Sequence, residues 1–250
     1  MKKMVSVLLA LGLCLAVNAS AAEKIVVGTS ADYPPYEYTD ASGKFVGFDM
    51  DLIRAIGEKM GVKIKIVDMG FDTLIAALQK EKIDVVIAAM QATPERAEKV
   101  DFSTVYRTIA DALLVKKGSG IKLTSVFDQV NYKIGSQTGT IQEKWIKDNL
   151  IKTGKLPEKN YFSYERVDNA AMDLKAGRID VLHIQSDPAT ALVKKNDLEI
   201  ALISKEAIAA GQSLAVTKGN TKLLNRINNA IEALKADGTM DKLTKKYNLL

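Results

Sequence analysis

Short apolar runs alternate with amphipathic helical segments along the chain, and this alternation constrains the fold more than any other feature. In the first part of the chain, the runs that pattern as buried strands occupy 24–29, 62–67 and 83–90. Between the first two runs, Asp49 is predicted to cap a helix that ends at Gly61. Strands that alternate with helices are typical of a parallel, doubly wound α/β sheet.

The same pattern returns in the second part of the chain. A strand over 132–135 leads into a helix that starts near Gln142. Further along, a helix over 168–176 leads into a strand over 178–184. The repetition predicts a second α/β unit, built like the first.

Two apolar segments with adjoining glycines, at 110–115 and 209–216, are interpreted as crossings between two lobes. The predicted fold is therefore α/β, with two doubly wound α/β lobes joined by a two-crossing hinge. The predicted division is a signal peptide over 1–22, a discontinuous lobe 1 over 23–109 and 212–250, and lobe 2 over 110–211. The alternative is one continuous α/β domain.

The chain begins with the features of a secretory signal peptide. A charged start precedes an apolar run over 5–17 and small residues over 19–22. We predict cleavage near Ala22, with Ala21 as the close alternative, and export to the periplasm. The only cysteine, Cys14, lies inside this leader, so the exported chain is predicted to have no disulfide.

The composition argues against several classes of function. Without the leader, the formal net charge falls from +5 to +3 and the basic residues are spread along the chain, which predicts no nucleic-acid partner. One histidine and no cysteine cannot build a zinc site, so we expect no metal and no cofactor. The chain has no G-x-S-x-G, H-E-x-x-H or P-loop motif, and we expect a binding protein, not an enzyme.

The candidate site is predicted at the carboxyl ends of the strands, where open parallel sheets bind their ligands. Loops follow such ends after Thr29, Met90 and Gly135. A glycine-containing turn that opens a helix, as after Gly135, offers free N–H groups to an anion. The candidates in and beside these loops are Ser30, Tyr33, Glu37, Ala89, Gln91, Arg96, Gln137, Thr140 and Ile141.

Arg96 follows the apolar run over 83–90 and is the predicted anion anchor. Its guanidinium is planar, permanently charged and fork-shaped, so it can bind a carboxylate through two parallel hydrogen bonds. Tyr33 and Phe71 are candidates to flank a ligand side chain by stacking or cation–π contact. The alternative for Arg96 is an exposed position on a helix, paired with Glu95 or Glu98.

The chain resembles the polar amino-acid family of periplasmic solute-binding proteins, which supply ABC importers. The resemblance covers nearly the whole exported chain, in order and at the expected spacing. It rests on the segments 28–30, 33–38, 47–52, 93–96, 100–103, 138–140, 176–180 and 236–239.

The resemblance implies the type II periplasmic binding protein fold, in which two lobes close on one amino acid, here a polar or basic one. By position, Arg96 is implied to clamp the ligand carboxylate, with Thr140 contributing from the second lobe. Gln91 and Gln185 match the positions that hold the ammonium. The implied partners are a free amino acid or related small carboxylate and an ABC transporter permease, and we expect a monomer.

Two residues depart from the family pattern. The family commonly has Ser, Thr or Asp where Gln91 stands, and Asp or Glu where Gln185 stands. An amide oxygen accepts a hydrogen bond from an ammonium but brings no charge. Three interpretations stay open: a shifted register that gives the role to Asp187, a ligand without an ordinary α-ammonium, or weaker binding. Ser30, which replaces the Asp of some cationic amino-acid binders, weakens the case for an arginine or lysine ligand.

Two other functions compete with amino-acid delivery to a transporter. Relatives with this fold dehydrate cyclohexadienyl amino acids such as arogenate, but that reaction needs an acid or base in the cleft, which Gln185 does not supply. The second competitor is a detached amino-acid sensor. The favoured hypothesis is capture by hinge closure followed by delivery to a permease.

Overall fold

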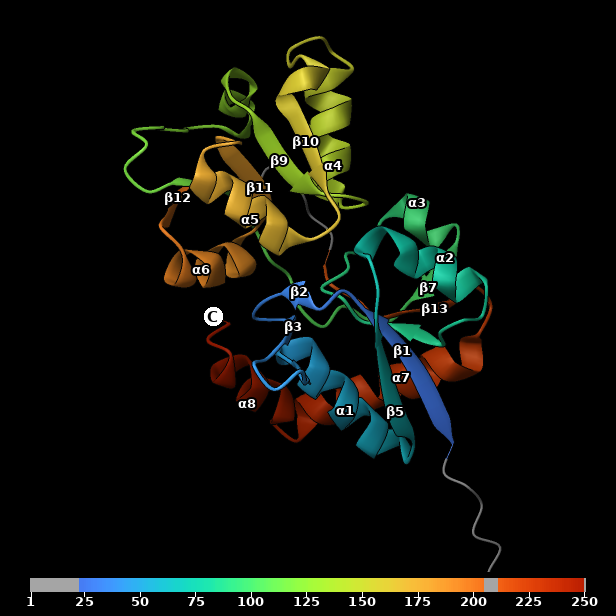
Figure 1. The fold of residues 1–250 in the computed structure, drawn as a ribbon. Coiled ribbons are helices and arrows are strands. Elements are labelled where there is room, and N and C mark those ends of the chain that lie inside the picture. Colours follow the sequence, from blue (N-terminus) through green and yellow to red (C-terminus); the bar gives the residue numbers. More distant parts are fainter. Residues whose placement is uncertain (1–22, 205–210, 250) are drawn as a thin grey trace, which may run out of the picture.

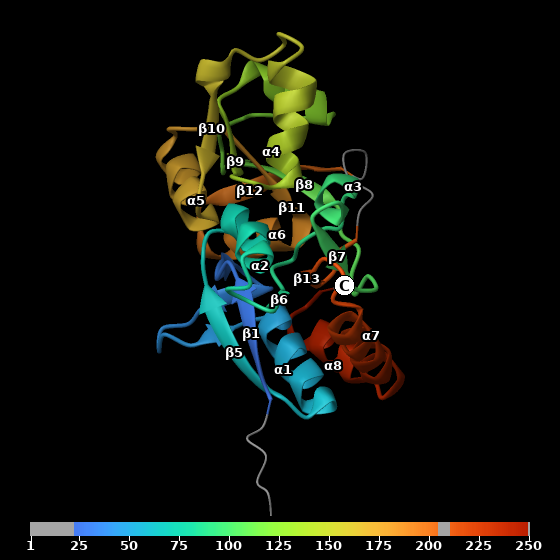
Figure 2. The same ribbon diagram turned by 90° about the vertical axis from the view of Figure 1, so that its right-hand side faces the viewer.

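The computed structural model describes residues 23–204 and 211–249, so the predicted signal peptide lies outside the described residues. The described chain forms two α/β lobes, each built around its own five-stranded sheet (Figure 1 and Figure 2). The predicted class, α/β with two lobes, is confirmed. No helix among the described residues is long and apolar enough to cross a membrane.

The first sheet has the strand order β5-β1-β6-β13-β7. These strands are β1 Lys24–Thr29, β5 Lys63–Asp68, β6 Val85–Val86, β7 Val100–Phe102 and β13 Ala215–Thr217. Strand β1 runs parallel to β5 and β6, whereas β13 runs antiparallel to β6 and β7. The expectation of a purely parallel sheet is therefore wrong at β13, which enters the sheet from the other lobe. The strand predicted over 83–90 is regular only at β6.

Helices cover both faces of the first sheet. They are α1 Phe48–Met60, α2 Leu74–Gln79, α3 Pro94–Ala97, α7 Thr221–Ala236 and α8 Thr239–Lys246. Val85 packs into the cluster that contains the apolar face of α1, and the next residue, Val86, packs into the cluster of α2. This alternation follows from the period of two along a strand, and it explains why β6 is apolar throughout.

Helix α1 begins differently from the prediction. Gly47, with φ +125°, occupies the cap position, and a Cβ there would lie 2.2 Å from the carbonyl oxygen of Tyr36. Asp49 is not the cap: it lies in the first turn and is fully buried. Because glycine fills the cap, the Asp49 carboxylate is free to accept hydrogen bonds from Ala89 N at 2.7 Å and Tyr106 Oη at 3.0 Å. The predicted end at Gly61 is confirmed by its left-handed conformation.

The second sheet has the strand order β10-β9-β11-β8-β12. Its elements are β8 Asp111–Lys116, β9 Ile134–Gln137, β10 Tyr161–Tyr164, β11 Val181–Gln185 and β12 Leu198–Ser204, with helices α4 Ile141–Ile146, α5 Val167–Ala176 and α6 Ser186–Lys195. Strand β9 is parallel to β10 and β11, but β8 is antiparallel to β11 and β12. This sheet is mixed for the same reason as the first, since β8 arrives from the opposite lobe.

Two extended segments, 103–110 and 211–214, join the lobes side by side. Gln212 N donates to the carbonyl oxygen of Arg107 at 2.7 Å, and Ser103 N donates to Leu214 O at 2.8 Å. The apolar run predicted as the first crossing, 110–115, is instead largely strand β8 within the second sheet. The described part of the second crossing lies within the predicted 209–216 segment.

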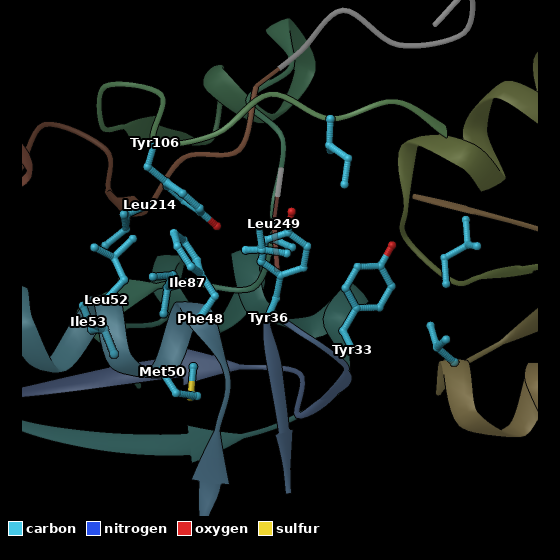
Figure 3. Close-up of a cluster of buried hydrophobic side chains, with 14 of the residues drawn as sticks. Tyr33, Tyr36, Phe48, Met50, Leu52, Ile53, Ile87, Tyr106, Leu214 and Leu249 are labelled. Atoms are coloured by element: carbon cyan, nitrogen blue, oxygen red, sulfur yellow. The ribbon is translucent and has the colours of Figure 1, made fainter. Parts of the chain in front are cut away.

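A small three-stranded sheet, β2 Asp32–Tyr33, β3 Glu37–Thr39 and β4 Phe45–Val46, projects from the first lobe. Below it, Phe48 packs between Tyr36 and Tyr106, with ring centroids 6.1 Å from each (Figure 3). Tyr33 lies beyond this aromatic cluster (Figure 3). The small sheet therefore carries Tyr33 and Glu37 to the region between the lobes.

Candidate functional site

A small enclosed cavity lies between the two lobes. It is lined by residues of both, namely Ser30, Tyr33, Glu37, Phe71, Ala88, Ala89, Gln91, Gln137, Thr140, Gln142 and Gln185. Nine of the eleven candidates from the sequence lie in this wall, while Arg96 and Ile141 lie beside Thr140 in an adjoining open cleft of about 450 Å³. The cavity holds only about 10 Å³, close to the space that one water molecule needs. A ligand of amino-acid size therefore requires the lobes to move apart.

Arg96 bridges the two lobes. Thr93 caps its short helix and accepts a hydrogen bond from Arg96 N at 3.2 Å. The guanidinium donates to the carbonyl oxygen of Gln91 at 2.7 Å and, across the cleft, to that of Gly139 at 2.9 Å. Its carbon lies 5.4 Å from the ring centroid of Phe71. Burial lowers the pKa of Arg96 to about 10, which leaves the group cationic at neutral pH.

The alternative of an exposed Arg96 paired with a neighbouring glutamate does not match these contacts. Glu95 forms its ion pair with Lys144 of the second lobe, at 3.1 Å. The guanidinium of Arg96 instead holds two carbonyl oxygens, which are weaker partners for a guanidinium than a carboxylate. A ligand carboxylate at the mouth of the cavity would therefore compete favourably for the same donors.

The second lobe presents a tight turn to Arg96. Gly139 has φ +78°, and a Cβ at this position would lie 2.8 Å from the Cα of Asp72 in the first lobe. Thr140 caps α4, accepting from Glu143 N at 3.2 Å and donating to Gln137 O at 2.6 Å. The absence of a side chain at 139 thus lets the two lobes approach closely.

Glu143, which the sequence reasoning did not identify, fixes this turn. Its carboxylate accepts from Gly139 N at 2.6 Å, Ser163 Oγ at 2.8 Å and Lys147 Nζ at 2.8 Å. The signal was present in the sequence, because a glutamate three residues after a threonine cap marks a helix start. Here the glutamate accepts a hydrogen bond from Gly139 N, one residue before the cap.

Gln91 and Gln185, the two residues that depart from the family pattern, lie in different environments. Gln185 is held by its neighbours, since its Oε1 accepts from Gln212 Nε2 at 3.0 Å and its Nε2 donates to Ala89 O at 3.5 Å. Gln91 lines the cavity, and its buried Nε2 has no hydrogen-bond partner within the described structure. An unpartnered buried donor is costly, so Gln91 is suited to bind an acceptor atom of a ligand.

Asp187 does not take the place of Gln185. It lies in the first turn of α6 and is outside the cavity wall. Its carboxylate accepts from Tyr36 Oη at 2.7 Å and from Arg107 Nη2 at 2.8 Å. The shifted-register interpretation is therefore wrong, because this carboxylate is committed to an ion pair beside the hinge.

Glu37 is a cavity-lining carboxyl group that is only 1% exposed. Burial, together with the charge of Asp49, raises the pKa of Glu37 well above its usual range. Burial also raises the pKa of Asp49 to about 6. Each acid affects the pKa of the other, so the protonation of the two groups is coupled.

Arg166 of the second lobe forms a further bridge to the first, which the sequence reasoning also did not identify. Its Nη1 donates to Asp68 Oδ1 at 3.1 Å and to Ser30 Oγ at 3.4 Å, and its Nη2 pairs with the other oxygen of Asp68. Asp32 accepts from Val167 N at 2.5 Å. Asp68 directly ends β5, so the general rule about strand ends would have pointed to it.

A buried polar group in the second lobe supports the cavity wall. Gln142 donates to Asp111 Oδ1 at 2.8 Å, and His183 Nε2 lies 3.3 Å from the other oxygen of Asp111. The ring centroids of His183 and Trp145 are 5.8 Å apart. Within the described ranges, no group of histidine, cysteine or acidic residues is arranged to hold a metal ion.

Comparison with known proteins gives consistent matches over nearly the whole chain. The family model for the bacterial extracellular solute-binding proteins, family 3, matches residues 25–249. The ABC transporter arginine-binding protein 1 of Escherichia coli (strain K12) is 36% identical over 251 residues, covering 99% of each chain.

Two solved structures are similar in fold and sequence. An ancestral arginine-binding protein bound to arginine matches with a TM-score of 0.83, and an ancestral arginine-binding protein bound to glutamine matches with 0.82. Each is 39% identical to this chain, and each match covers 90% of this chain and 97% of the other.

Proposed function

Because the chain belongs to family 3 of the bacterial extracellular solute-binding proteins, we propose that it captures a polar or basic amino acid between its lobes and presents it to an ABC transporter permease. Members of this family are binding proteins, so the chain is a binding protein and not a dehydratase. Capture outside the cytoplasm follows from the predicted leader over 1–22 and from the extracellular character of the family.

The observation that carries the proposal is the position of Arg96. Its guanidinium stands in the open cleft that adjoins the cavity at Thr140, and it already spans the lobes from Gln91 O to Gly139 O. A ligand carboxylate replaces these carbonyl contacts with a stronger, charge-assisted pair. Since the turn over 138–140 lies on the far lobe, the same carboxylate favours the closed arrangement.

The remaining wall residues suit the rest of an amino acid. Tyr33 and Phe71 offer aromatic surfaces to a side chain. The carbonyl oxygen of Ala89 and the amide oxygen of Gln185 already accept one hydrogen bond each, and each can accept a second one from an α-ammonium. Glu37 supplies the acidic group for the far end of a basic side chain.

Arginine is the first ligand to test, with glutamine as the neutral comparison. The relatives named above include arginine-binding proteins, and the two solved relatives hold arginine and glutamine. A planar guanidinium is a suitable cation–π partner for the rings of Tyr33 and Phe71. Entry and release use rotation about the crossings at 103–110 and 211–214.

The test is calorimetric titration with arginine and glutamine, using wild type and Arg96→Ala. We expect Arg96→Ala to weaken binding by roughly 10²–10³-fold, because the ligand carboxylate loses its charged partner. Arg178→Ala is the matched control, since Arg178 is 71% exposed and pairs only with Asp173 at 2.6 Å. Unchanged affinity in Arg96→Ala would mean that the carboxylate binds elsewhere.

A further inference from the structure

Two buried acids meet behind the cavity wall. Glu37 opens β3 and lines the cavity, while Asp49 lies one layer deeper in the first turn of α1. Asp49 Oδ2 is already occupied, because Ala89 N donates to it at 2.7 Å and Tyr106 Oη at 3.0 Å. The other oxygen of Asp49, and Oε2 of Glu37, are buried without any N–H or phenol donor among the described residues.

The two carboxyl groups interact with each other, and a proton shared between their two unpartnered oxygens would satisfy both. Two ionised carboxylates only accept, so an unprotonated pair in this position would be repulsive. The groups facing the pair from the surrounding elements are Asp32 and Tyr33 on β2, Tyr36 beside them, and Tyr106 on the crossing. None of these is basic, so none of them offsets a second negative charge on the pair, and this favours one shared proton.

We propose that Glu37 and Asp49 form a charge-adaptive unit: the shared proton stays on Glu37 when the ligand side chain is neutral and moves to Asp49 when it is cationic. The inference rests on the proposed function, because it assigns the group that meets the side chain of the captured amino acid. The O–H bond of Glu37 breaks and an O–H bond of Asp49 forms. No proton enters or leaves the protein, and the net charge of the pair stays at one negative unit.

The physical reason is the different requirement of the two ligand classes. A buried guanidinium needs an ionised carboxylate beside it, since an unpaired buried cation is costly. An amide or ureido oxygen needs a donor, which the unpartnered Gln91 Nε2 supplies, and a neutral Glu37, whose proton is directed at Asp49, places no charge beside it. The same set of wall residues thereby accepts both kinds of side chain.

Arginine and citrulline test this directly, because they differ only in a guanidinium against a neutral ureido group. At pH values above that at which the pair takes up a second proton, we expect arginine affinity to be independent of pH. Below pH about 6, where Asp49 also becomes protonated, arginine affinity is expected to fall about tenfold per pH unit, and citrulline affinity to stay flat. Calorimetric titrations with both ligands measure this effect. They should cover about two pH units on either side of the protonation of Asp49.

The variant Glu37→Gln distinguishes the effect of this acid pair on arginine affinity from the effect of other acidic residues. The amide keeps a donor toward Asp49 but cannot ionise, so arginine affinity should fall at least about 10²-fold and citrulline affinity should change little. The control is Glu58→Gln, an exposed residue on α1, which should change neither. If the pH-dependent gap between the ligands persists in Glu37→Gln, Asp32 is responsible and the inference is overturned.

Infrared spectroscopy gives a readout that needs no affinity. The free wild-type protein at pH 7 should show a protonated-carboxyl band that disappears in Glu37→Gln, and arginine should shift that band without abolishing it. Absence of the band overturns the inference. If arginine binds with the pH profile of citrulline, the charge-adaptive unit is overturned but the proposed function stands. If no amino acid binds at all, both the proposed function and the charge-adaptive unit are overturned.

Discussion

At the scale of single residues, hydrogen bonds between distant parts of the chain decide how a polar group of the cavity wall is used. Gln185 is bonded to Gln212 and to Ala89, 27 and 96 positions away, and no local pattern predicts such pairings. Residue type and position were enough to assign Tyr33 and Phe71 to the site, and the structure gathers them in one place.

Stability should depend on pH through Glu37 and Asp49. Both have pKa values raised by burial, so the native state holds more protons than the unfolded state above pH about 4, and the free energy of unfolding falls as pH rises through about 6. Glu37→Gln should therefore stabilise the ligand-free protein by on the order of 1–3 kcal/mol at pH 8 and by little at pH 4.

Denaturant melts at the two pH values measure this effect. Glu58→Gln should show no pH-dependent gain, because that side chain is exposed. A Glu37→Gln variant that is less stable than wild type at pH 8 would show that the acid pair does not carry a burial penalty.

At the scale of elements, periodicity placed strands and helices well but could not give strand direction. The helix expected over 168–176 matches α5 within one residue at each end. The antiparallel course of β8 and β13 was missed, because direction depends on which lobe a strand comes from. The small sheet of β2, β3 and β4 was also missed, since two- and three-residue strands are too short to show a period.

The turn before α4 depends on one side chain of that helix. Glu143→Gln removes a carboxylate that holds Gly139 N, Ser163 and Lys147, so the turn over 138–140 should loosen. We expect a loss of about 1–3 kcal/mol in unfolding free energy and a weaker affinity for arginine. Asp148→Asn is the control, because that carboxylate bonds only lysines on the exposed side, at 2.6 Å. Equal behaviour of the two variants in melts and calorimetry would exclude the positioning role.

At the scale of the whole molecule, the lobes are held by a few bridges around a small cavity. Arg166 binds Asp68 on one side, Lys144 pairs with Glu95 on another, and Arg96 reaches Gly139 between them. These contacts join surfaces that are polar and partly exposed, so each is worth little alone. A ligand that replaces one carbonyl contact with a charged pair can therefore shift the balance between open and closed arrangements.

A crystal structure of the protein grown with arginine would show whether one amino acid bridges the lobes through Arg96. We expect the ligand carboxylate between the Arg96 guanidinium and the turn at Thr140, with the side chain between Tyr33 and Phe71 and its guanidinium at Glu37. If arginine binds outside the inter-lobe cavity, with Arg96 still on the carbonyl oxygen of Gly139, then Arg96 is not the group that holds the ligand carboxylate.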